Sequence, residues 1–200
     1  MNDLEIRGGG AILGASQSGH IAAVGYDMFL QLMEEAVADL KGEPIVQPLD
    51  PEINIQLSAY FSEAYVPDID QRMFLYRRLA RMSELQEISD MRAELTDRFG
   101  PLPDEATHLL FKIMLKVLAR HAGVSRLDLK GRMLVLWFSA DHVQDPSAVA
   151  ELIRRDPKQF ELSPDGVLKA RLAAQGTVGQ LAQAKNILQA IGQRVNSQEN

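Results

Sequence analysis

The sequence predicts an α+β fold, with a mostly antiparallel sheet packed by helices and preceded by a glycine-rich helical hook segment. Three observations predict this class. Apolar residues recur at helical spacing in several windows up to residue 122, two hairpin patterns follow, and helical patterns come between and after the hairpins. Helices and strands in this order are typical of an α+β domain with one hydrophobic core.

Two regions of different composition divide the chain. Residues 1–44 hold six glycines within the first 25 positions and a helical pattern over 21–40. They contain 7 acidic and 2 basic residues, whereas residues 45–200 contain 20 acidic and 19 basic residues. Because residues 43–52 include three prolines, which are typical of an extended linker, we place the domain boundary between residues 44 and 45.

The first elements after the linker are a strand and helices. Residues 53–58 alternate between apolar and polar side chains, which indicates a half-buried strand. A helix is predicted over about 69–82, with Asp68 or Asp70 as its N-cap. A helix over 104–122 has a wide apolar stripe, so we expect it to be the most buried of the three helices in this part.

A further helix is predicted between these two. The segment Ser83–Gln86 matches a capping box, in which the Gln86 side chain returns to the amide of the cap residue. The apolar stripe that follows ends at Phe99, and Gly100 with the proline after it terminates the helix.

The last third of the chain changes to β-rich runs with turn residues between them. The predicted elements are a hairpin of 124–129 and 133–138, a helix from 146 to about 155, a hairpin of 160–162 and 167–172, and a helix over 177–193. The aromatic side chains are expected in the core: Tyr60, Phe61, Tyr65, Phe74, Tyr76, Phe99 and Trp137.

Composition excludes several classes of function. The chain has 200 residues, 46% of them hydrophobic and 24% charged, with a net charge of −6 and no cysteine. Disulfides, thiolate metal sites and cysteine nucleophiles are therefore excluded. A chain of this charge is a poor candidate for binding nucleic acid by itself, because such binding depends on pairing Lys and Arg with phosphates. No apolar run reaches the ~20 residues of a membrane span, so we expect no membrane partner and a cytoplasmic location.

The motifs of common catalytic sites are missing. There is no phosphate-binding GxxxxGK[ST] loop, no GxSxG and no HExxH, and the four histidines are never three or four positions apart. We therefore expect no catalytic residue, cofactor or metal in this chain. The feature that remains is glycine-rich: Arg7 precedes three glycines, and Gln17 and Ser18 follow. Spacing alone favours an ordinary connector over a ligand-binding loop.

Three segments resemble one protein family. Residues 3–21 resemble the translocation motif of the transcription-repair coupling factors (Mfd), which is shared with the RecG helicases. Residues 63–80 resemble a second signature of the coupling factors, EYIPD…QR…LYKRLA, and residues 94–103 resemble a third, ELxDRFGPLP. RecG proteins have proline near position 9, where this chain has Gly9, and they end soon after the motif, so the coupling factors are the better match.

The resemblance implies a function for each region. Residues 1–44 would be the C-terminal end of the second RecA-like motor domain, with Arg7 and Gln17 as translocation residues. Residues 45–200 would be the C-terminal regulatory domain, which packs on a UvrB-like domain of the same protein and masks the surface that recruits UvrA until the protein meets stalled RNA polymerase. The whole protein would be a double-stranded DNA translocase of helicase superfamily 2 that uses ATP and Mg and acts in nucleotide excision repair.

An acidic stripe lies on the predicted helix 85–99. It consists of Glu87, Asp90, Glu94 and Asp97, which are spaced to share the side opposite the apolar stripe. The stripe has two interpretations, a solvated helix face or a docking face for an Arg-rich partner. The resemblance to the coupling factors places Glu94 and Asp97 at the autoinhibitory interface.

The helix before it is basic, with Arg72, Arg77, Arg78 and Arg81. These side chains are expected to pair with the acidic stripe or to lie at the surface. An alternative function is a nucleic-acid-binding module that contacts DNA through Arg7, Gln17 and the Arg72–Arg81 helix. A second alternative is a free-standing adaptor whose glycine-rich start is only a linker.

Overall fold

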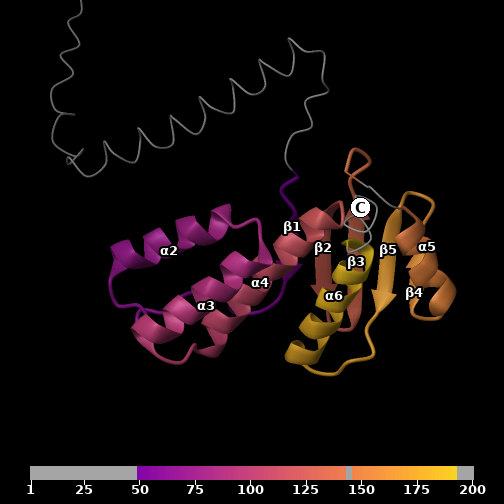
Figure 1. The fold of residues 1–200 in the computed structure, drawn as a ribbon. Helices are drawn as coiled ribbons and strands as arrows, with labels where there is room; N and C mark the ends of the chain where they lie inside the picture. Colours follow the sequence, from indigo (N-terminus) through magenta and orange to yellow (C-terminus); the bar gives the residue numbers. More distant parts are fainter. Residues whose placement is uncertain (1–48, 143–145, 193–200) are drawn as a thin grey trace, which may run out of the picture. The chain divides into compact units, whose positions relative to one another are not determined.

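The computed structural model of the chain describes residues 49–142 and 146–192 (Figure 1). The hook segment, the boundary between residues 44 and 45, and both Arg7 and Gln17 lie outside these ranges. The described residues form five helices and one five-stranded mixed sheet, which confirms the predicted α+β class.

The sheet has the strand order β1-β2-β3-β5-β4. Its strands are β1 (Glu52–Ile55), β2 (Val124–Lys130), β3 (Met133–Phe138), β4 (Phe160–Leu162) and β5 (Val167–Arg171). Every neighbouring pair is antiparallel except β1 and β2, which are parallel, so the sheet is mostly antiparallel as predicted.

Local turns explain the hairpin of β4 and β5 and the early end of β1. β4 and β5 are joined by a turn in which Gly166 has φ 75°, a conformation that glycine adopts without steric cost. The predicted strand 53–58 is shorter in the structure, because the amide of Leu57 bonds to the carbonyl of Ile55 (3.0 Å) and turns the chain away from the ladder.

Alternation along the strands gives the sheet two different faces. One face is buried and packs against α4 (Asp104–His121), α5 (Pro146–Arg155) and α6 (Thr177–Gly192), whose apolar residues join the strands in one core. The opposite face carries mostly exposed polar side chains, and no described helix packs on it. We call this second face the open face.

A second core contains no residue of the sheet. It is formed by α2 (Ile69–Arg81), α3 (Leu85–Phe99), the segment before α2 and the first part of α4. We call this region the helical half, and the sheet with α5 and α6 the sheet half (Figure 1). Helix α4 belongs to both halves: Leu109 and Leu110 lie in the helical core, whereas Leu115 and Leu118 lie in the sheet core. It has the most buried residues of the first three helices, as the sequence predicts.

Caps fix the ends of α2 and α3. The amide of Gln71 donates to Asp68 Oδ1 (2.7 Å), so Asp68 is the N-cap of α2. The predicted capping box at Ser83 is wrong by one residue: α3 has Glu84 as N-cap, and Glu87 rather than Gln86 accepts the free amides. Gly100 ends the helix, as the sequence predicts, with φ 85°.

Three aromatic residues predicted in the core lie elsewhere. Tyr60 and Phe74 are 46% and 52% exposed. Trp137 is half-buried and belongs to neither core, because its position on β3 points to the open face of the sheet. The core position predicted for Trp137 is therefore wrong. In a strand whose residues are all apolar, the sequence does not show which alternate residues face the helices.

Candidate protein-docking surface

Helix α3 holds the acidic stripe on the surface of the helical half. Its Ile88, Met91 and Leu95 are buried in the helical core, and this packing fixes which side of the helix faces outward. Of the four predicted docking residues, Glu87, Asp90 and Asp97 are exposed and Glu94 is half-buried.

Glu94 is the centre of an ion-pair cluster. Arg78 of α2 and Arg98 of α3 each place a guanidinium nitrogen 2.7 Å from a carboxylate oxygen of Glu94. The hydrogen bond from Arg78 lowers the pKa of Glu94, and Arg98 adds to this effect, against the opposing effect of burial. Since Arg78 lies on a different helix, the cluster joins α2 to α3 as well as carrying charge.

Glu87 and Asp90 have local partners. The Oε2 atom of Glu87 accepts the amides of Glu84 (2.9 Å) and Ser83 (2.8 Å), and these bonds lower the pKa of Glu87. Asp90 Oδ1 accepts from the side-chain amide of Gln86 (2.8 Å). Glu87 therefore stabilises the start of α3, a role that the sequence pattern assigned to its neighbour Gln86.

Asp97 differs from the other three carboxylates. It is exposed, and within the described ranges its side chain makes no hydrogen bond or ion pair. It precedes Arg98 on the outer side of α3. Of the predicted docking residues, Asp97 is thus the one whose charge is left for an outside partner.

The basic helix α2 uses much of its charge internally. Arg72 Nη1 donates to the carbonyls of Val66 and Pro67 (2.5 and 2.8 Å), and Arg78 holds Glu94. Arg77 Nε donates to the carbonyl of the residue one turn earlier (3.3 Å). The prediction that these arginines pair with the acidic stripe is confirmed for Arg78, and fewer charges than the sequence suggests remain for phosphates.

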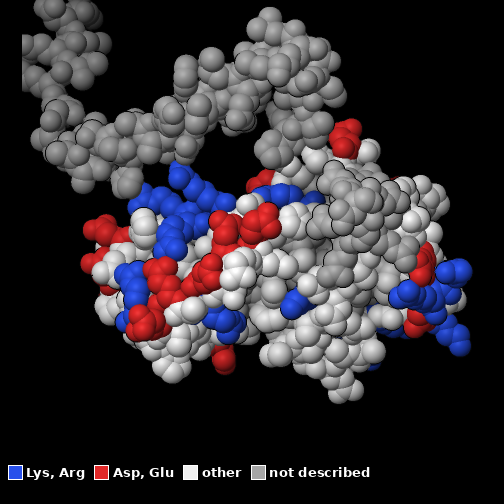
Figure 2. Space-filling model, viewed as in Figure 1, with Lys and Arg blue, Asp and Glu red and all other residues white. Residues whose placement is uncertain are grey.

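Apolar side chains interrupt the charged surface of α2. Ile69, Met73 and Phe74 are 62%, 46% and 52% exposed. Arg78 lies over the Phe74 ring, with 5.7 Å between the guanidinium carbon and the ring centre. Figure 2 shows acidic and basic side chains interleaved over α2 and α3, whereas the surface over α6 carries few charges. Mixed charge beside exposed apolar area is typical of a protein-binding surface.

Sequence reasoning found the acidic stripe but missed its internal partners. The spacing of Arg78 and Glu94, 16 positions apart on two helices, carries no local signal for an ion pair. Among the described residues no group of three or more metal-ligating side chains comes together, and no helix is long and apolar enough to cross a membrane.

Comparison with known proteins places this chain among its relatives. The TRCF domain family matches residues 55–149. The chain is 41% identical over 189 residues to the transcription-repair-coupling factor of Myxococcus xanthus, a match that covers 94% of this chain and 16% of that protein. It is 31% identical over 173 residues to the Escherichia coli factor, covering 84% of this chain and 15% of that protein. The chain thus spans about a sixth of the length of these relatives.

A solved structure has the same fold. The crystal structure of the C-terminal domain of a transcription-repair coupling factor matches with a TM-score of 0.66 at 17% identity, covering 75% of this chain and 96% of that chain. The fold, the domain match and the relatives agree with the three sequence signatures. The chain carries a TRCF domain and belongs to the family of the transcription-repair coupling factors.

Proposed function

We propose that this chain is the regulatory part of an ATP-dependent double-stranded DNA translocase that couples transcription to nucleotide excision repair. In this proposal it performs no catalysis and binds a UvrB-like domain of the same protein, so that the surface that recruits UvrA is masked until the protein meets stalled RNA polymerase. Membership of the coupling-factor family supports the setting. The observation that carries the docking role is the outer side of α3, where an exposed carboxylate without a partner in the described ranges lies beside a preformed ion-pair cluster.

The cluster suits docking because it is already ordered. Arg78, Glu94 and Arg98 hold one another in place, so a partner that contacts them immobilises fewer free side chains. Asp97 adds a carboxylate that can accept a charge-assisted hydrogen bond from an arginine or lysine of the partner. The exposed apolar residues of α2 supply adjoining area that gains from burial.

The docking role is tested with a charge reversal at Asp97 in the full-length protein. We expect Asp97→Lys to leave the fold unchanged, because the side chain is exposed and unpaired within the described ranges. We expect it to weaken docking on the UvrB-like domain by about tenfold, which corresponds to roughly 1.4 kcal/mol. Recruitment of UvrA by the resting protein, measured as the dissociation constant of the complex, should therefore become tighter.

A matched control separates docking from a general effect of charge. Glu63→Lys makes the same change at an exposed carboxylate of the helical half that lies outside the stripe, and it should leave recruitment of UvrA unchanged. Equal recruitment by the Asp97→Lys and unaltered proteins would refute the docking role of α3.

We propose that Arg7 and Gln17 couple ATP hydrolysis to movement along duplex DNA, with ATP and Mg bound by the motor elsewhere in the protein. The support is the match of residues 3–21 to the translocation motif. In the full-length protein, Arg7→Ala should preserve ATP hydrolysis while translocation, measured by displacement of a triplex-forming strand, falls. Normal translocation by this variant would refute the proposed coupling role of Arg7.

A further inference from the structure

We propose that the open face of the sheet binds single-stranded nucleic acid, chiefly through its phosphates. This surface lies on the sheet half and is separate from the docking surface on α3, so the inference goes beyond the proposed regulatory function. Register and alternation place the following side chains on the open face: Glu52, Asn54, Arg126, Asp128, Lys130, Met133, Val135, Trp137, Glu161, Val167, Lys169 and Arg171, of which Val167 is buried.

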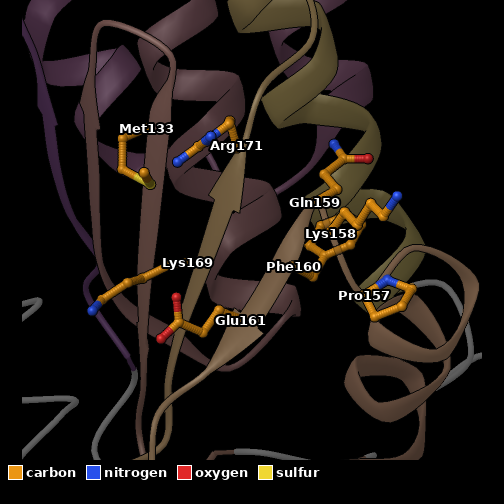
Figure 3. Close-up of a pocket in the computed structure, with 8 residues that line it drawn as sticks. All are labelled: Met133, Pro157, Lys158, Gln159, Phe160, Glu161, Lys169 and Arg171. Carbon is orange, nitrogen blue, oxygen red and sulfur yellow. The ribbon is translucent and has the colours of Figure 1, made fainter.

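A hollow of about 380 Å³ lies at one edge of this face (Figure 3). Its wall extends from Met133 of β3 across β5 to β4 and the loop before it, as Figure 3 shows. Lys158, Lys169 and Arg171 supply three cations to the lining, and Glu161 supplies the single carboxylate. The hollow therefore has a positive balance, although the chain as a whole is acidic.

The three cations have no ion-pair partners in the described part of the chain. The side chains of Lys158, Lys169 and Arg171 make no hydrogen bond or ion pair there. Glu161 lies opposite Lys169 on the neighbouring strand, yet the two side chains form no ion pair within 4.0 Å. The charge of Lys169 also acts on Asp165 in the turn, again without an ion pair. Each cation can thus neutralise a phosphate without breaking an internal contact.

The cations are spread out rather than gathered around one point. Lys169 and Arg171 are alternate residues of β5, about 7 Å apart along the strand. Lys130 extends the same row, because it pairs with Met133, which pairs with Arg171, about 10 Å away across two strand spacings. One small anion cannot reach all of these side chains, whereas a chain of phosphates can.

An aromatic platform lies on the same face. Arg126 stacks over the ring of Trp137 at 4.9 Å and pairs with Asp128 at 2.9 Å, and its side chain remains 46% exposed. The hydrogen bond from Arg126, with a further bond from Asn54, lowers the pKa of Asp128, so this carboxylate is already compensated. Unpaired bases stack on aromatic rings and on guanidinium planes.

These two features favour single-stranded nucleic acid over an acidic peptide. A peptide of carboxylates would use the cations of the hollow and leave the Trp137–Arg126 platform unused. A duplex would also leave it unused, because its bases are already stacked on one another. Cations that follow the backbone and an aromatic surface on which bases stack are the two features that sequence-tolerant single-strand binders combine.

The test uses the intrinsic fluorescence of Trp137, the single tryptophan of the chain. The whole 200-residue chain is titrated with unlabelled single strands of about 12 nucleotides, within the length that one such module covers, in separate DNA and RNA arms. We expect saturable quenching at about 50 mM salt. Contacts to three or four phosphates should give a slope of log K against log salt of about −2 to −3.

Single substitutions then locate the site. Lys158→Gln, Lys169→Gln and Arg171→Gln should each reduce the salt slope by about 0.7, and the triple variant should lose the quenching. Arg92→Gln removes an exposed cation of α3 as a matched control and should change nothing. Thermal unfolding of each variant shows that the fold is intact.

The remaining results of the titrations each either support the proposal or overturn it. Binding of both DNA and RNA strands supports the proposal, and a preference identifies which of the two is the ligand. Unchanged quenching in the triple variant overturns it, as does an equal loss in Arg92→Gln. Tighter binding of duplex than of single strand, or equal quenching by polyglutamate, also overturns it, because neither ligand offers free bases to Trp137.

Discussion

The helical half and the hollow on the open face of the sheet differ in how they use their basic side chains. In the helical half, Arg72 binds backbone carbonyls, and Arg78 and Arg98 share Glu94. On the open face of the sheet half, Lys169 and Arg171 form no ion pair in the described part of the chain. A count of charges along the sequence therefore does not show which charges a partner can reach.

The difference follows from the geometry of the two halves. Neighbouring helices bring long side chains of different elements toward one another, so an arginine of α2 can reach a glutamate of α3. Side chains on one face of a sheet stand nearly parallel, with neighbours fixed by the register. Arg126 pairs in this way with Asp128 of the same strand, whereas Lys169 and Glu161 lie opposite each other on neighbouring strands without an ion pair.

The largest expected effect concerns whether the two halves fold independently. Leu95 is fully buried in the helical core, and Leu95→Ala should cost about 2–5 kcal/mol. Because α4 lies in both cores, we expect the sheet half to unfold together with the helical half. Denaturation followed by Trp137 fluorescence, a probe in the sheet half, should then shift as much as denaturation followed by circular dichroism.

The control for this experiment is Leu162→Ala, which removes a leucine that is 46% exposed on β4 and should change stability by less than about 1 kcal/mol. Two separate transitions in the Leu95→Ala protein, with the fluorescence transition unmoved, would show that α4 does not couple the halves.

A smaller loss of stability is expected from removing one partly buried polar contact of the helical half. The amide of Phe61 donates to the hydroxyl oxygen of Tyr76 (2.8 Å), and the two rings lie 5.3 Å apart. Tyr76→Phe keeps the ring and leaves this amide without its acceptor, so we expect a loss of about 1–2 kcal/mol in the free energy of unfolding. Urea denaturation measures the free energy of unfolding of both proteins. If the two values agree within experimental error, a water molecule replaces the hydroxyl as acceptor for the amide of Phe61.

Local patterns predicted most of the elements. Periodicity and turn residues placed all five described helices and the two hairpins within a few residues of their observed ends. Gly100 was identified as a helix end, and Asp68 was one of two candidate caps with Asp70, because a cap depends on residues only a few positions apart. The family signatures identified the domain in the same way, from short runs of residues.

Features that depend on distant contacts were not predictable in this way. The parallel pairing of β1 with β2 joins residues about 74 positions apart, and no residue of β1 encodes that choice. The exposure of Phe74 and the position of Trp137 on the open face depend on which side of each element the rest of the chain covers. The acidic stripe was predicted, but the engagement of Glu94 by Arg78 required knowing that α2 and α3 lie side by side.

The ion-pair cluster of the helical half predicts a pH dependence of stability. Glu94→Gln should lower stability near neutral pH by up to about 1 kcal/mol, since the cluster is partly exposed and screened. The pKa of Glu94 is lower in the folded chain than its ordinary value of 4.5. Its contribution is therefore complete above that value and is lost as the pH falls through the lowered folded-state pKa.

The measurement is urea denaturation of the unaltered protein and the Glu94→Gln variant at several pH values. The difference in stability between the two proteins should shrink as the medium becomes more acidic than the ordinary pKa of glutamate, and it should also shrink at high salt. A difference that stays constant from neutral to acidic pH would show that packing, rather than charge, holds the cluster.

The smallest expected effect separates two neighbouring residues at the start of α3. Glu87 accepts the amides of Ser83 and Glu84, whereas Gln86 only donates to the exposed Asp90. Glu87→Ala should therefore lower the melting temperature slightly, and Gln86→Ala should leave it unchanged, because alanine favours the helix at both positions. The Glu87 effect should fade in acid, since its lowered pKa means that its contribution is lost only once the carboxylate is protonated. Equal melting temperatures for the two variants would show that the bonds to Glu87 add no measurable stability, and a larger loss for Gln86→Ala would assign the cap to Gln86.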